Sequence, residues 1–99
     1  MRENEDRILQ RIARELRRAQ RDLDEIEQRI ATLEKQVAQI GADLEKPELY
    51  TDAQGLKEAK ALGTKLESVK RELDDVLERW SLATEQVEEL NRELAATET

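Results

Sequence analysis

Apolar residues recur along this chain in two runs, and in both runs the steps alternate between three and four residues. The first run extends from Leu9 to Leu44 and the second from Ala59 to Leu94. Such an alternation averages 3.5 residues, which is the period of a coiled coil. The chain's one proline, Pro47, lies between the runs. Because a short connector allows two long helices to pair only side by side and in opposite directions, the pattern predicts an all-α fold, a two-helix antiparallel coiled-coil hairpin.

Local signals predict where the helices begin and end within a single domain of residues 1–99. The first helix is expected over about 4–46, with Asn4 as N-cap, because the residue before Pro47 is disfavoured in the α conformation. The turn is expected over about 47–52, with Pro47 opening a short helical turn. The segment Thr51-Asp52-Ala53-Gln54 resembles a capping box and predicts a second helix over about 53–97.

The sizes of the apolar residues indicate how the two runs pair. Heptad position a is assigned to Leu9, Leu16, Leu23, Ile30, Val37 and Leu44, and to Ala59, Leu66, Leu73, Trp80, Val87 and Leu94. Position d lies three residues after each a. If paired residue numbers sum to 99, each small residue meets a large one, and Ala19 and Trp80 face each other as structural residues of the seam. This register also predicts two charged pairs between the helices, Arg29 with Glu72 and Asp22 with Arg79.

Composition limits the functions open to the chain. It has 99 residues, of which 41% are charged, and it contains no His and no Cys. Disulfides and thiolate metal sites are therefore excluded, and no Gly-rich phosphate loop is present. We expect no catalytic residues, no cofactor and no metal site. No apolar run approaches the ~18 residues of a membrane span, so we expect a cytoplasmic protein without a membrane partner. The formal net charge of −7 argues against a chain devoted wholly to nucleic acid.

The outer surface of the predicted hairpin has one concentrated basic patch. Between positions 7 and 21 there is a single acidic residue, Glu15, among six arginines at heptad positions b, c and f. These are Arg7, Arg11, Arg14, Arg17, Arg18 and Arg21. In one interpretation they form a solvated face that the acidic second helix neutralises. In the other they contact the phosphates of a nucleic acid. Base-specific readout is not expected, because the patch has no aromatic residues.

The predicted turn carries a second candidate contact. Leu49 and Tyr50 are expected to close the end of the seam over Leu44 and Leu56, or alternatively to contact a partner. Glycines at positions 41 and 63 flank this end, and each costs up to ~1 kcal/mol in a helix interior. We therefore expect the half of the hairpin nearest the turn to be less stable.

Three segments together resemble a known family. The leucine-rich stretch 33–44, the turn Lys46-Pro47-Glu48-Leu49-Tyr50-Thr51-Asp52 and the later Leu77-Glu78-Arg79-Trp80 are similar to the C-terminal coiled-coil domain of ABC-F ATPases. The resemblance covers roughly residues 22–90. It implies a non-catalytic accessory domain of a soluble, cytoplasmic tandem ATPase acting around translation, with weak, sequence-independent contact to DNA or ribosomal RNA. No Walker A, Walker B or ABC signature is present, so any ATPase domains would lie upstream.

Other classes of function explain part of the pattern. The hairpin is also similar to the tRNA-contacting arm of valyl-tRNA synthetase and to the N-terminal hairpin of peptide-chain release factors, although neither explains Glu-Arg-Trp. A structural or protein-protein interaction hairpin, natural or designed, explains the seam without nucleic-acid binding. The sequence leaves open whether the chain is an excised domain, a free-standing protein or an engineered one. It also leaves open a monomer or a weak homodimer, because Ile8, Leu77 and Leu82 are apolar outside the seam.

Overall fold

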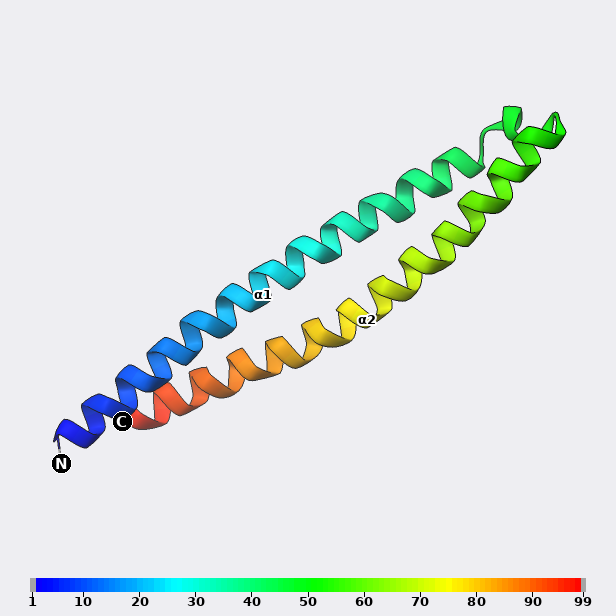
Figure 1. The fold of residues 1–99 in the computed structure, drawn as a ribbon. Helices are drawn as coiled ribbons and strands as arrows, with labels where there is room; N and C mark the ends of the chain where they lie inside the picture. The colour runs from blue at the N-terminus through cyan, green and yellow to red at the C-terminus, as the bar shows by residue number, and fades with distance from the viewer. Residues whose placement is uncertain (1, 99) are drawn as a thin grey trace. The chain divides into compact units, whose positions relative to one another are not determined.

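The computed structural model describes residues 2–98, and its ordered elements are all helical (Figure 1). Helix α1 spans Arg2–Leu44, the 3-10 helix η1 spans Pro47–Tyr50, and α2 spans Ala53–Glu98. No strand occurs within this described part of the chain. The predicted all-α antiparallel hairpin is confirmed.

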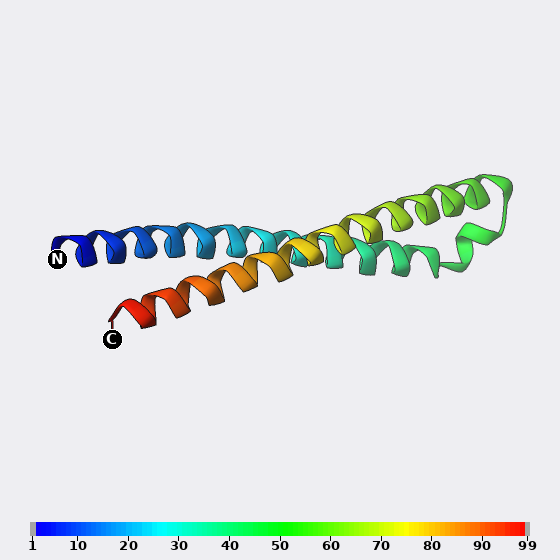
Figure 2. The same cartoon turned by 90° about the horizontal axis from the view of Figure 1, so that it is seen from below.

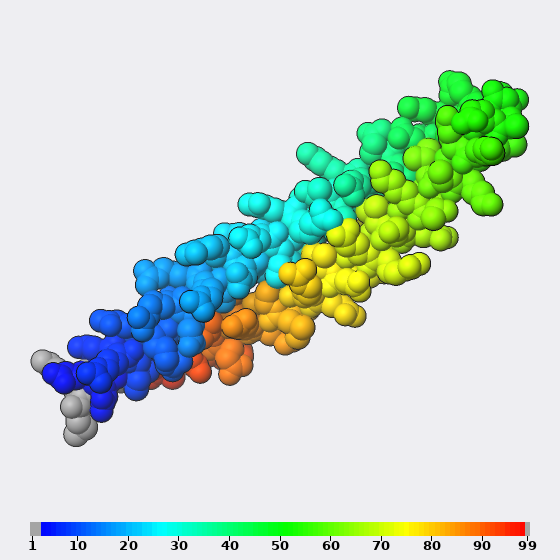
Figure 3. All heavy atoms as spheres, viewed as in Figure 1, coloured from blue at the N-terminus to red at the C-terminus, as the bar shows by residue number. Residues whose placement is uncertain are grey.

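The helices divide into two compact units. Of the described residues, 2–27 and 78–98 form one, which we call the terminal unit, and Gln28–Leu77 form the other, which we call the turn unit. Within each unit a segment of α1 lies beside a segment of α2 that runs in the opposite direction (Figures 1 and 2). Side chains fill the space between the paired segments (Figure 3). Each unit is therefore a two-helix pair with its own stretch of seam.

The seam is covered more deeply on one side than on the other. Its buried hydrophobic residues all occupy position d: Ile12, Ala19 and Leu90 in the terminal unit, and Leu33, Ile40, Val69 and Val76 in the turn unit. The residues at position a are half-buried, except for Trp80, which is 37% exposed. Two helices provide no third element to cover either side of the seam, so the residues at position a keep contact with solvent.

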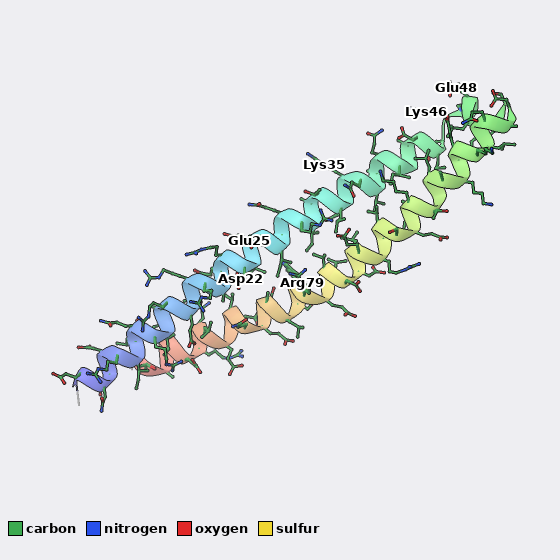
Figure 4. The ribbon with its side chains drawn as sticks, in the orientation of Figure 1. Asp22, Glu25, Lys35, Lys46, Glu48 and Arg79 are labelled. Atoms are coloured by element: carbon green, nitrogen blue, oxygen red, sulfur yellow. The ribbon has the colours of Figure 1, made fainter. Side chains whose placement is uncertain are left out.

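One ion pair between the helices confirms the predicted register in the turn unit. Arg29 of α1 donates to Glu72 of α2, and both side chains are about half exposed. In the terminal unit, Asp22 and Arg79 lie on the two paired helices (Figure 4). No ion pair within 4.0 Å joins these two residues in the described part of the chain. The pairing of Ala19 with Trp80 therefore stays a prediction.

Helix α1 begins earlier and ends earlier than its sequence predicts. It starts at Arg2, so Asn4 lies inside the helix and the predicted N-cap is wrong. Residues 2–6 include neither Gly nor Pro, so nothing in them stops the helix at Asn4. At the other end, Glu45 N donates a hydrogen bond to Ala42 O, and Lys46 N donates one to Asp43 O. Each of these bonds is 3.2 Å long. Each bond spans three residues instead of the four of an α-helix. The α-helix therefore ends at Leu44, two residues before the predicted end.

Residue Lys46 links the end of α1 to η1. Its backbone is extended, with φ −68° and ψ 120°, as the following Pro47 requires. Lys46 Nζ lies 3.2 Å from Asp43 Oδ1, which also accepts a 3.0 Å hydrogen bond from Gln39 Nε2. Both hydrogen bonds lower the pKa of Asp43, and the one from Lys46 has the larger effect. An anionic Asp43 near the C-terminus of a helix opposes the helix dipole, so the charge of Lys46 offsets an unfavourable interaction there.

The N-terminus of α2 is capped one residue later than predicted. Asp52 Oδ1 accepts a 2.7 Å hydrogen bond from Gly55 N, and Asp52 O accepts the first helical bond from Leu56 N at 3.1 Å. Asp52 is therefore the N-cap. Thr51 is instead the C-cap residue of η1, and its hydroxyl donates a 2.9 Å hydrogen bond to Glu48 O. Pro47 opens η1 as the sequence predicts.

Candidate nucleic-acid interface

The six arginines between positions 7 and 21 lie on α1 in the terminal unit, and all are exposed. We call them the arginine stripe. Five follow steps of four and three residues, which place them in one line on the helix face opposite the seam: Arg7, Arg11, Arg14, Arg18 and Arg21. Arg17 lies beside this line at position b. At 1.5 Å per residue, the line is about 21 Å long. In the space-filling view, the blue segment of α1 that carries the stripe lies at the surface (Figure 3).

Among the described residues, most of the stripe has no charged partner. Arg11 Nη1 lies 3.2 Å from Glu15 Oε1, one turn along the same helix, and both side chains are about half exposed. The other five arginines form no ion pair within 4.0 Å in the described part of the chain. An exposed ion pair of the Arg11–Glu15 type contributes roughly 0.3–0.5 kcal/mol, so a phosphate can compete for Arg11 as well.

The acidic helix does not neutralise the stripe by direct contact. The exposed glutamates of α2 in the terminal unit include four between positions 78 and 89: Glu78, Glu85, Glu88 and Glu89. Glu89 pairs with Arg92 of its own helix at 3.6 Å. Among residues 2–98, none of the four forms an ion pair with the stripe. Their charges can act on the stripe only through space, and such an effect is largely screened beyond about 8 Å at physiological salt.

The stripe can bind phosphate groups but has no aromatic ring on which a base could stack. The chain's aromatic residues are Trp80 and Tyr50, and neither lies between positions 7 and 21. Stacking on aromatic rings supplies much of the affinity for single-stranded bases. Within the described residues, no group of three or more acidic side chains could hold a metal ion. None of the described helices has an apolar stretch long enough to cross a membrane.

The turn presents a different surface from the one expected. Tyr50 is 52% exposed, but its hydroxyl donates a 2.5 Å hydrogen bond to Leu44 O, the carbonyl of the last residue of α1. Leu49 is half-buried. Leu56 is 53% exposed, so the expected closure of the seam does not extend over it. The reason is positional, since Leu56 lies at position e, one step outside the a/d stripe. A role of Leu49 and Tyr50 in contacting a partner stays a prediction.

The two structural seam residues differ in how far they are covered. Ala19 is buried, with 5% of its surface exposed, whereas Trp80 keeps 37%. Trp80 is therefore less covered than the sequence predicts. An indole is much larger than the methyl group of alanine, and with only two helices no further element covers the part of the ring that projects beyond the seam.

Comparison with protein families gives a match over most of the chain. The family described as the ABC transporter C-terminal domain matches residues 14–83. The matched segment includes η1, Trp80 and four arginines of the stripe. No curated protein and no solved structure matches the chain.

Proposed function

The chain belongs to the ABC transporter C-terminal domain family, and we propose that it is the non-catalytic accessory domain of a cytoplasmic ABC-F ATPase. The ATPase domains that bind and hydrolyse nucleotide would be its natural partners, since the chain contains no phosphate-binding loop. Its own contribution would then come from the surface of the hairpin, because two paired helices bury a narrow seam and leave the rest of their side chains exposed.

We further propose that the arginine stripe contacts the phosphate backbone of DNA or ribosomal RNA. The observation that carries this proposal is the exposure of all six arginines, with only Arg11 held in an ion pair among the described residues. Arg is well suited to phosphate because its guanidinium presents a planar set of donors. Side chains along about 21 Å of a straight helix can reach several phosphates at once.

The contact should be weak and independent of base sequence. The formal net charge of −7 opposes the approach of the chain to a polyanion. The stripe lacks aromatic residues that could stack on bases, and phosphates carry no sequence information. Such a contact would position the attached ATPase on nucleic acid without selecting a particular sequence.

Binding measured against salt concentration tests this proposal. Fluorescence anisotropy of labelled duplex DNA and duplex RNA should show an affinity that falls steeply with salt. Engagement of about four phosphates gives a log–log slope near −3.6 on DNA. Replacing four arginines of the line with Gln should abolish binding and leave the helix content measured by circular dichroism unchanged. These are Arg11, Arg14, Arg18 and Arg21, none of which lies in the seam.

A matched control keeps the same change in charge. Four exposed lysines of α2 are replaced with Gln instead: Lys57, Lys60, Lys65 and Lys70. The proposal expects this control to bind nearly as well as the unmodified chain. If the control loses binding and the stripe variant keeps it, the interface lies on α2 and the proposal is wrong.

A protein-protein interaction hairpin is the alternative. The exposed Tyr50 and Leu56 near the turn favour it, because apolar side chains of this size often contact protein partners. This alternative predicts no nucleic-acid binding by the unmodified chain even at low salt.

A further inference from the structure

One carboxylate lies within the arginine stripe and is held by it. Arg11 Nη1 donates to both carboxylate oxygens of Glu15, over 3.2 Å to Oε1 and 3.3 Å to Oε2. Both side chains are about half exposed. The acidic residues on either side of the stripe, Asp6 and Asp22, form no ion pair with it in the described part of the chain. Glu15 therefore occupies a place on Arg11 that a phosphate oxygen would take.

Glu15 has no charged counterpart across the seam. It occupies position g, from which side chains of a coiled coil reach the partner helix. In the turn unit the g residues Arg29 and Glu72 meet, and their numbers sum to 101. The same sum in the terminal unit makes the neutral Gln86 the counterpart of Glu15. Within residues 2–98 no ion pair joins Glu15 to α2. Its charge therefore acts on the stripe and not on the pairing of the helices.

The contact with Glu15 and an end-on contact with phosphate exclude each other at Arg11. A guanidinium binds phosphate end-on through both of its terminal nitrogens. Glu15 holds one of them, Nη1, so this contact requires the carboxylate to leave. A phosphate at the remaining nitrogens would stand beside the carboxylate, and two neighbouring anions repel each other. Since residues three apart are neighbours on a helix, a phosphate bound to Arg18 is repelled in the same way.

We propose that Glu15 is a built-in competitor of phosphate, which occupies Arg11 and limits the affinity of the arginine stripe for nucleic acid. This inference rests on the function proposed above and concerns the regulation of the same site. Because an exposed ion pair is weak, nucleic acid can displace the carboxylate, but it must break the pair to do so. The stripe then binds less tightly than the same arginines would without Glu15, and the complex dissociates more readily.

Replacing the carboxylate by an amide of the same size tests the proposal. Glu15→Gln should bind the labelled duplexes at least about threefold more tightly at low salt, because Arg11 is freed for phosphate. The log–log salt slope on DNA should steepen by up to ~0.9, which corresponds to one further phosphate contact. Helix content measured by circular dichroism should not change, since Glu15 is exposed. A merely structural role predicts weaker binding, because the variant loses an ion pair within α1.

Glu89 provides a matched control on the other helix. It is an exposed glutamate of the terminal unit and pairs with Arg92 at 3.6 Å, three residues along α2. Glu89→Gln removes the same formal charge and also frees an arginine, but neither residue belongs to the stripe. It should tighten binding by no more than about 1.5-fold, because a charge outside the contact acts only at long range and is screened.

A double-mutant cycle shows whether Glu15 acts through Arg11. In a chain that carries Arg11→Gln there is no guanidinium at this position to set free. The change in log Kd that Glu15→Gln causes should therefore fall to about half or less in that chain. The part that remains reports the repulsion between Glu15 and phosphates bound to neighbouring arginines.

The outcomes separate this proposal from the proposed function. If the unmodified chain binds and Glu15→Gln binds equally well or more weakly, the competitor role is wrong and the proposed function stands. An equal gain from Glu89→Gln would also overturn it, because net charge alone would then explain the gain. A gain that persists in full without Arg11 would contradict competition for that guanidinium. If neither the unmodified chain nor Glu15→Gln binds at low salt, both proposals fail, whereas binding by the variant alone supports both.

Discussion

The three glycines of this chain have different roles, although each lies within a helix. A Cβ on Gly55 would stand 2.3 Å from Leu49 O and 2.8 Å from Leu49 C, both of which are backbone atoms of η1. A Cβ on Gly41 or Gly63 would meet nothing within 4 Å. Gly55 is therefore required where η1 packs against the first turn of α2. The other two glycines have no such steric requirement.

Alanine substitutions should separate these roles. Gly55→Ala should destabilise the fold by about 1–3 kcal/mol, because the backbone of η1 would have to move away. Gly41→Ala and Gly63→Ala should each stabilise it by up to about 1 kcal/mol, since alanine restricts the unfolded chain and favours the helix. Urea denaturation followed by circular dichroism measures all three. Equal effects at the three positions would mean that η1 does not pack closely on Gly55.

At the scale of the helices, the heptad pattern distinguishes residues of the same type. Leu33 occupies position d and has 0% of its surface exposed, whereas Leu82 occupies position c and has 66% exposed. Both lie well inside their helices. The contribution of a leucine to stability should therefore follow its heptad position.

This pair allows the same substitution in two environments. Leu33→Ala should cost about 2–5 kcal/mol, from lost burial and the cavity left in the seam. Leu82→Ala should change stability by no more than about 0.5 kcal/mol, because an exposed side chain has little contact to lose. Thermal melts of the two variants give the comparison. Similar midpoints would show that the d side of the seam is not the main source of stability.

At the scale of the whole molecule, the register is the feature that links the two helices. The Arg29–Glu72 ion pair confirms it within the turn unit. In the terminal unit it predicts that Ala19 and Trp80 face each other. The half-exposed indole is compatible with this pairing, because a ring opposite alanine can extend past the seam.

Disulfide trapping in the cysteine-free chain tests the register of the terminal unit. Cysteines at positions 19 and 80 should cross-link readily under mild oxidation, because facing seam positions bring Cβ atoms within the ~4.5 Å that a disulfide needs. Cysteines at positions 26 and 80 should not, because Ile26 lies two turns further along α1. Preferential coupling of 26 with 80 would indicate a register shifted by one heptad. Non-reducing electrophoresis gives the readout.

The sequence predicts part of the candidate nucleic-acid interface. Spacing alone predicts that the arginines lie away from the seam, because residues at b, c and f cannot face the partner helix of a coiled coil. Whether the glutamates of α2 pair with them depends on side-chain positions across two helices, which spacing does not determine. Sequence reasoning also missed the importance of Gly55, because an N-cap Asp accepts a hydrogen bond from a backbone N–H and so does not require a glycine three residues later. Its steric role arises from contact with Leu49, which no local pattern reveals.

The sequence by itself determined the two helices, the turn at Pro47 and the direction of pairing. The 3.5-residue period is repeated throughout each apolar run, and the proline interrupts the helix at one position. It also determined which residues form the seam. Only the tertiary structure decided how deeply each of them is covered. Most residues at position d are buried and none at position a is, because coverage depends on the residues that the partner helix brings beside each site. The tertiary structure likewise decided that Asp52 caps α2, because that choice depends on where η1 ends.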